Sequence, residues 1–464
     1  MEFLKVEENG TAKLFFLSSA IWFALGTLEG ITAATQMVIP DLYGGIAGLV
    51  FSRVRPMHTT TMIFGFAGSA LLGGAHYILP SVLRTPLWSE KLGKVSLWVW
   101  NLSILTGIVA LDLGHSQGRE YAEWIWPANI GVLLSMALMF VNLLQTTAQR
   151  QEKLMYVSTW YIFAGLVYTW FIYFFGHAVF NMKGAITGLP DAILAWFYGH
   201  GIVGLFLTPL AIAIAYYIVP RVARSPLYSH TLSLVGFWTI LVIYTHIGAH
   251  HILQAPIPVW LKTMAVSGSI AMIIPVFTVL VNLWLTMRGR LGLFYADIGG
   301  RFVMAGLVWY ILTCTQGPIM ALPIVQRVTH LSNFVIAHSH IGVFGFSGMI
   351  ALGGLYYMLP RITGKPLYSV RLADVQYWLL ILGMAGFFIV LTGGGLVQGN
   401  AWLNGTTVYR TLPMIHIYFI LRAALGVLIV GAAFIGLYNV IRTILGGQAE
   451  GERIFEEVFQ GEPQ

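Results

Sequence analysis

The sequence predicts an all-α, polytopic membrane protein with about twelve transmembrane helices. Of its 464 residues, 57% are hydrophobic and only 9% are charged, whereas a soluble domain carries roughly 25% charged residues. The apolar residues form runs of about 20, the length that an α-helix needs to cross a bilayer. Basic residues outnumber acidic ones by 25 to 18, but their placement in the loops accounts for this excess, and no nucleic-acid partner is expected.

Twelve apolar runs are long enough to span a lipid bilayer. They cover residues 14–38, 59–80, 95–113, 128–148, 156–178, 192–219, 231–252, 263–286, 300–322, 333–359, 374–396 and 412–440. Most connecting segments are short and contain Pro and Gly turn signals. We therefore expect one membrane domain, residues 1–445, followed by a polar tail, residues 446–464.

The loop charges predict the orientation of these spans. Sixteen Lys and Arg residues lie in loops on one side and seven in loops on the other. Cytoplasmic loops carry the excess of Lys and Arg, so both termini are expected in the cytoplasm. The single cysteine, Cys314, excludes an internal disulfide and any zinc or iron–sulfur site that needs several cysteines.

Histidines gather at one depth in this arrangement. Six of them fall in the outer half of the membrane: His58, His200, His250, His251, His338 and His340. Polar side chains at membrane depth are costly unless they pair, bind something or line a cavity. A lone histidine in a span is more often a packing residue than a ligand, and that is our interpretation of His76, His177 and His246.

The spacing of the remaining histidines favours metals. Two adjacent imidazoles, His250 and His251, are expensive to desolvate without a metal, and a third histidine on another helix completes a set that suits copper. His338 and His340 point about 200° apart on a helix. They cannot easily share one metal, but they can serve two haem irons on opposite sides of that helix.

The motifs resemble the haem–copper oxidase superfamily, and most closely the catalytic subunit of cbb3-type cytochrome c oxidases. The resemblance extends along nearly the whole chain, in order, through "RPMHT", "GREYAEWIWP", "WFYGHGIVGLFLT", "YYIVPRVARSPLYS", "YTHIGAHH", "VTHLSNFVIAHSHIGVFGF" and "HIYFILRA". It implies reduction of O2 to water in a bacterial inner membrane, with coupled proton translocation.

The resemblance also implies a role for each histidine of the layer. His58 and His340 would be the axial ligands of a low-spin haem b, and His338 the proximal ligand of a high-spin haem b. His200, His250 and His251 would bind one copper ion. Tyr244 would be the redox tyrosine, cross-linked to His200.

Two positions depart from the family pattern, and two other functions stay open. Gln316 and Asn333 stand where the family usually has a glutamate and an aspartate. A nitric oxide reductase of the same superfamily remains an alternative because of Gln316, although Tyr244 and the absence of a glutamate at Gly204 favour oxygen. A non-redox transporter would leave the histidine layer unexplained.

A polar path for protons is expected on the span that carries Tyr244. Ser233, Tyr244 and His251 form one stripe on this span, because their spacings bring them within about 20° of one another. Thr208 and Tyr216 descend the preceding span towards the same side. Ser and Thr in spans often bond backbone carbonyls instead, but the resemblance marks these positions as a K-type proton channel.

Electrons must reach this chain from partners. It has no CxxCH motif for covalent haem c, so the resemblance implies membrane-anchored cytochrome c subunits. Glu120 and Glu123 match a segment associated with calcium and haem propionates, and a pairing of these acids with Arg119 is the alternative. Haem propionates are also the expected partners of three further residues, Arg55, His330 and Arg422.

Overall fold

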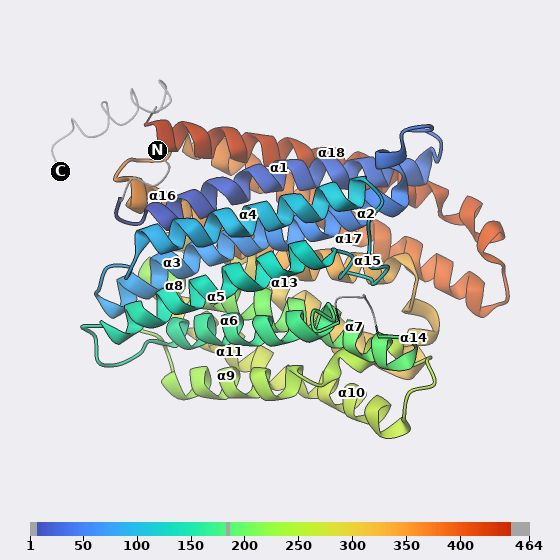
Figure 1. Cartoon of the computed structure of the whole chain (residues 1–464), viewed down its shortest axis with the longest axis horizontal. Coiled ribbons are helices and arrows are strands. Elements are labelled where there is room, and N and C mark those ends of the chain that lie inside the picture. Colours follow the sequence, from blue (N-terminus) through green and yellow to red (C-terminus); the bar gives the residue numbers. More distant parts are fainter. Residues whose placement is uncertain (1–6, 182–185, 447–464) are drawn as a thin grey trace.

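The structure, a computed structural model, describes residues 7–181 and 186–446. Within these residues the protein is all-helical, and the long helices run side by side as a bundle (Figure 1). The beginning of α1 and the end of α18 lie at the same end of the bundle. Towards the opposite end of the bundle lie the helices α2, α7, α10, α14 and α15 (Figure 1).

The helices follow one another along the chain with short connections. The α-helices are α1 (Gly10–Val38), α2 (Phe51–Thr60), α3 (Ser69–Leu83), α4 (Glu90–Asp112), α5 (Trp126–Ala148), α6 (Val157–Gly176), α7 (Leu189–Gly201), α8 (Thr208–Ala223), α9 (His230–Tyr244), α10 (Val259–Ala271), α11 (Ile273–Met287), α12 (Leu291–Ala296), α13 (Ile298–Met320), α14 (Pro323–Thr329), α15 (Asn333–His340), α16 (Met349–Thr363), α17 (Val370–Leu403) and α18 (Val408–Leu445). Two 3₁₀ turns are η2 (Ala47–Leu49) and η5 (Ile247–Ile252), and three π-helical turns are η3 (Thr61–Gly68), η4 (Ile202–Leu207) and η6 (Ile341–Gly348).

The expected spans correspond closely to these helices. In the described part of the chain, eleven helices are long and apolar enough to cross a membrane, and α9 is a shorter apolar helix. The protein is therefore a multi-pass membrane protein. All but one residue of the expected polar tail lie outside the described residues.

One expected span, residues 231–252, is wrong at its end. Helix α9 stops at Tyr244, and the adjacent histidines lie on the 3₁₀ turn η5. The expected helical stripe from Ser233 to His251 is therefore broken after Tyr244, because a 3₁₀ turn advances about 120° per residue instead of the 100° of an α-helix.

Three loops each contain the same hydrogen-bonded motif, a serine backbone paired with an asparagine side chain, which we call a clamp. In the first, the Ser89 backbone N–H donates to Asn142 Oδ1 at 3.0 Å, and Asn142 Nδ2 donates back to the Ser89 carbonyl at 3.0 Å. Each serine also caps the helix that follows, as N-cap serines do. The other two clamps join Ser229 to Asn282 and Ser369 to Asn439.

The clamps mark an internal repeat. The three capping serines follow one another at intervals of 140 residues. Each clamp comes after a long helix that contains one buried π turn, η3, η4 or η6. At the same 140-residue interval, His200 corresponds to His340, and at twice that interval His58 corresponds to His338. Four of the six layer histidines thus occupy only two positions of the repeat, close before the π turns.

Candidate metal centre

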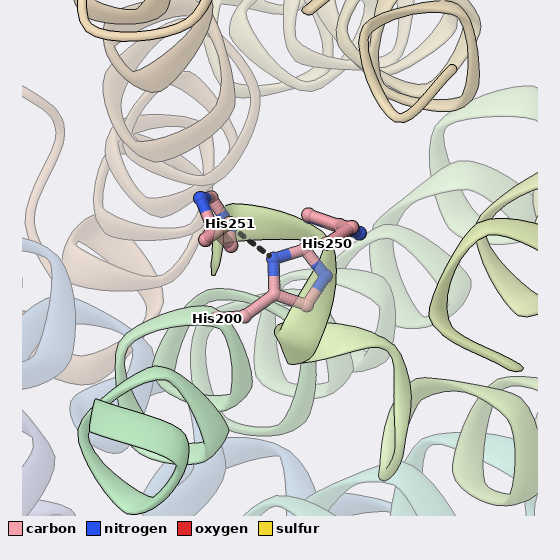
Figure 2. Close-up of side chains that lie close together, drawn as sticks. All are labelled: His200, His250 and His251. Atoms are coloured by element: carbon pink, nitrogen blue, oxygen red, sulfur yellow. Dashed lines mark hydrogen bonds between the residues drawn. The ribbon is translucent and has the colours of Figure 1, made fainter. Parts of the chain in front are cut away.

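Three imidazoles meet where α7 faces η5. One ligand atom from each of His200, His250 and His251 can be chosen so that all three lie within 4.8 Å of one another, and this is the one such group among the described residues. His200 Nδ1 lies 3.0 Å from His251 Nε2. Figure 2 shows His200 arriving from one ribbon and the histidine pair from the other.

This group fits a copper ion. Imidazole nitrogen is a preferred ligand of copper, and His200 Nε2 is buried with no partner among the described residues. Two of the rings that pack against His200 are the imidazoles of His250 and His251, with ring centroids 4.4 Å and 5.1 Å away. Such a cluster has few ways to satisfy its nitrogens in an apolar interior other than a shared cation.

Partners that the sequence did not reveal hold the histidine pair in place. His250 Nδ1 lies 2.7 Å from the hydroxyl of Ser269 on α10. Gln326 of α14 donates to the His250 carbonyl at 2.7 Å. Outer partners of this kind fix the tautomer and orientation of metal-ligating imidazoles. They escape sequence reasoning because they lie on other helices, 19 and 76 residues from His250, and no periodic pattern links them to it.

His330 contacts this turn as well. Its Nε2 lies 3.0 Å from the His251 carbonyl oxygen. The expected role at a haem propionate is therefore accompanied by a contact within the protein, which ties the segment after α14 to η5. The propionate role itself stays a prediction.

Tyr244 lies directly against the triad. Its ring stacks on the His200 imidazole with centroids 4.5 Å apart and an angle of 6° between the planes. A Cβ placed on Gly204 of η4 would overlap the Tyr244 ring. The phenol thus fills the space that a side chain at position 204 would need, and glycine is required there for the tyrosine to fit.

His338 faces the triad across a cavity. The cavity, of about 340 Å³, is lined by Tyr244, the histidine triad and His338. His338 Nδ1 lies 3.0 Å from Gln316 Oε1 of α13. The amide holds this imidazole from behind, and His338 Nε2 remains for a ligand, as a proximal haem ligand requires.

His340 faces a different neighbour. Its ring is stacked with that of His58, with centroids 6.3 Å apart and 22° between the planes. Metal–imidazole bonds of about 2 Å on each side would account for most of this separation. The Nδ1 atoms lie 2.7 Å from the Gly26 carbonyl and 2.8 Å from the Ile336 carbonyl, which leaves both Nε2 atoms for one iron. The two histidines of α15 therefore point to separate sites.

Part of the expected proton path is connected. Asn282 Nδ2 lies 3.0 Å from Ser233 Oγ and 3.4 Å from the Tyr216 hydroxyl, so the amide joins two helices of the path. Asn282 was not expected there. Thr208 lines the cavity beside Tyr244, but its hydroxyl bonds the Val203 carbonyl at 2.8 Å.

The acids of the outer loop pair with an unexpected partner. Arg55 binds Glu120 at 2.6 Å and Glu123 at 3.2 Å. The alternative pairing with Arg119 is wrong, because Arg119 is buried against Asp191. Burial raises the pKa of Glu123, and Arg55 opposes that rise.

Two further residues expected near the haem propionates, Arg422 and Asn333, contact other parts of the protein. Arg422 of α18 lies with Nη1 3.0 Å from Met37 Sδ and has no acidic partner among the described residues. A cation without an anion at this depth is costly, which fits an expected propionate. Asn333 donates twice to Gln398 Oε1, at 2.8 Å each.

The histidines interpreted as packing residues have neighbours of that kind. His76 bonds the Leu72 carbonyl at 2.8 Å and stacks on Phe15. His177 stacks on Tyr173 with centroids 3.8 Å apart. None of them belongs to the metal-binding group described above.

Known proteins resemble this chain over most of its length. A family model described as "Cytochrome C and Quinol oxidase polypeptide I" matches residues 10–428. The cbb3-type cytochrome c oxidase subunit CcoN1 of Stutzerimonas stutzeri is 30% identical over 447 residues, 93% of this chain and 94% of that protein. A cytochrome c oxidase subunit 1 homolog of Agrobacterium tumefaciens is 30% identical over 94% of this chain and 83% of that protein. The solved structure of a heme-copper terminal oxidase dimer has the same fold, with a TM-score of 0.78 at 19% identity over 95% of this chain and 85% of that chain.

Proposed function

Because the chain belongs to the family of cytochrome c and quinol oxidase polypeptide I, we propose that it is the catalytic subunit of a respiratory oxidase that reduces O2 to water. Membership makes it an oxidoreductase subunit with haem and copper. The observation that carries oxygen as the substrate is the Tyr244 ring stacked on His200 beside the cavity. Gly204 leaves no acid at the position that would favour nitric oxide.

In this proposal each histidine has one task. His200, His250 and His251 hold one copper ion, and His338 holds a high-spin haem b on the other side of the cavity. His58 and His340 hold a low-spin haem b. When bound, these groups supply the redox electrons for splitting the O–O bond.

Tyr244 supplies the electron and the proton that the haem iron and the copper do not provide. The four-electron reduction needs one more electron and a proton close to the oxygen, and the phenol can give both from beside the cavity. Bonding of its ring to His200 would keep the phenol in place. Protons reach it from the cytoplasmic side along Ser233, Asn282, Tyr216 and Thr208, with coupled proton translocation.

Electrons enter through partner subunits. The sequence carries no CxxCH motif, so membrane-anchored cytochrome c subunits would deliver electrons to the low-spin haem. Arg55, His330 and Arg422 would border the haem propionates. A calcium ion at Glu120 and Glu123 would have to compete with Arg55 for their carboxylates.

A metal and haem count on the purified complex tests the proposal. This chain should account for two b-type haems and one copper, and oxygen turnover should exceed nitric oxide turnover. In His200→Ala the copper content should fall while both haems remain. Unchanged copper and unchanged turnover in that variant would refute the copper site, and faster nitric oxide turnover would favour the alternative function.

A further inference from the structure

Glu29 is unusual because it is a carboxylate deep inside a membrane span. It lies in α1, nine residues before the helix ends at Val38, or about 14 Å along the axis. The other acids of the described residues lie in loops or within five residues of a helix end, as Glu90 and Asp112 do at the two ends of α4. An ionisable residue within a span is a functional candidate by default.

The carboxyl group of Glu29 forms no ion pair with any residue that the structure describes. Its Oε2 atom is buried and makes no hydrogen bond among the described residues. The neighbouring polar residue is Thr61, the first residue of the π turn η3. A carboxylate in such a place gains little from its surroundings, so a modest change of nearby charge decides whether it holds a proton.

Glu29 lies between two glycines that contact a proposed haem ligand. The Gly26 carbonyl lies 2.7 Å from His58 Nδ1. A Cβ on Gly30 would lie 2.7 Å from the His58 ring. Glu29 is within one helical turn of both glycines, which places its carboxyl group near the proposed low-spin haem.

The other charges around α1 are few. From α2, Arg55 is already paired with Glu120 and Glu123. From α18, Arg422 contacts Met37, eight residues or about 12 Å farther along α1 than Glu29, and its charge acts on the His58 and His340 rings.

Groups on the other helices packed against α1 lie still farther away. His76 of α3 stacks on Phe15, and Lys94 of α4 lies beside Gly10. Arg361 of α16 lies over the Tyr357 ring. The haem itself is therefore the nearby charge that changes during turnover.

We propose that Glu29 takes up one proton when the haem held by His58 and His340 takes up one electron. This inference rests on the proposed function, because it needs that haem. The electron comes from a reduced cytochrome c and the proton from water, and the carboxylate becomes a carboxylic acid. The oxidised haem has one more positive charge and favours the ionised carboxylate, whereas reduction removes that attraction.

Infrared difference spectra of the purified complex, reduced minus oxidised, test this assignment. A carbonyl band of a protonated carboxyl group should appear as the low-spin haem is reduced. Glu29→Gln should lose this band, and its low-spin midpoint potential should be higher than in the native protein and less dependent on pH. The control Asp374→Asn, at the beginning of α17, should keep both the band and the pH dependence.

Three outcomes would overturn the inference. They are a native protein without a carboxyl band, a band that persists in Glu29→Gln, and an unchanged pH dependence in that variant. If Glu29→Gln fails to assemble, Glu29→Asp keeps an acid, and the band must then move in frequency. Loss of the low-spin spectrum in His58→Ala tests the haem assignment separately, so a normal low-spin spectrum without the band defeats only the role of Glu29.

Discussion

Tyr244 is the residue on which we expect the chemistry of the cavity to depend. Tyr244→Phe keeps the ring that stacks on His200 but removes the hydroxyl. Haem and copper contents should stay normal, and oxygen turnover should fall by about 10²-fold or more, the usual range for a lost proton donor. Oxygen consumption of the purified complex measures this effect.

His246 provides the matched control for Tyr244. It lies two residues away and packs against α10, where a Cβ on Gly268 would lie 3.2 Å from its Nε2. His246→Gln should lose much less activity. Near-normal oxygen turnover in Tyr244→Phe would rule out the phenol as an obligatory donor and reopen nitric oxide as the substrate.

Gln316 is expected to tune the electron density on His338. Its amide oxygen lies 3.0 Å from His338 Nδ1, and a carboxylate would accept a hydrogen bond roughly twice as strong. Gln316→Glu should therefore make the imidazole a stronger donor to iron and lower the midpoint potential of the high-spin haem. Gln316→Leu removes the acceptor and should raise that potential. A redox titration that gives any other order of the three proteins contradicts this role.

At the scale of elements, α15 should serve two haems. His338 faces the cavity and Gln316, whereas His340 faces His58. Absorption spectra of His340→Ala and His58→Ala should both lack the low-spin signal and keep the high-spin haem. Loss of only the high-spin signal in either variant would mean that the assignment is reversed.

Substitutions in the three clamps can separate a structural role of the clamp asparagine from a role in proton transfer. Asn142→Ala, Asn282→Ala and Asn439→Ala each leave clamp groups unpaired and should each cost about 1–3 kcal/mol of stability, seen as a lower unfolding temperature. Only Asn282 also joins Ser233 to Tyr216, so only its variant should slow oxygen turnover per haem. Equal turnover in all three variants would remove Asn282 from the proton path.

Hydropathy predicted where the spans lie but not how they are interrupted. Apolar runs locate the helices because a bilayer admits little else, and the histidine layer was visible from depth alone. The end of α9 at Tyr244 was missed, since the segment to Ile252 stays apolar enough to continue a helix. The π turns were missed for the same reason.

Side-chain contacts between segments far apart in the sequence could not be predicted from the sequence either. Asn282 lies 53 residues from Ser229, and Arg55 lies 65 residues from Glu120. No periodic pattern marks such pairs, because either residue alone is compatible with many partners. The pairing of these acids with Arg119 was considered as an alternative because Arg119 is adjacent to Glu120 in the sequence, whereas the partner in the structure is Arg55.

For the whole molecule, the charge asymmetry predicts the topology. Lys153, in the loop after α5, belongs to the side with sixteen basic residues, and Asn404 lies in the loop after α17 on the other side. In spheroplasts, an impermeant thiol reagent should label Asn404→Cys directly and Lys153→Cys only after permeabilisation. The native protein, with Cys314 in the cavity wall, serves as the unlabelled control. The reverse labelling pattern would invert the topology.

The fit between Gly204 and Tyr244 has an evolutionary consequence. The phenol occupies the space above a glycine on another helix, so the two positions cannot drift independently. A side chain at 204 would fit only if residue 244 became smaller, so we expect substitutions at these two positions to occur together rather than singly.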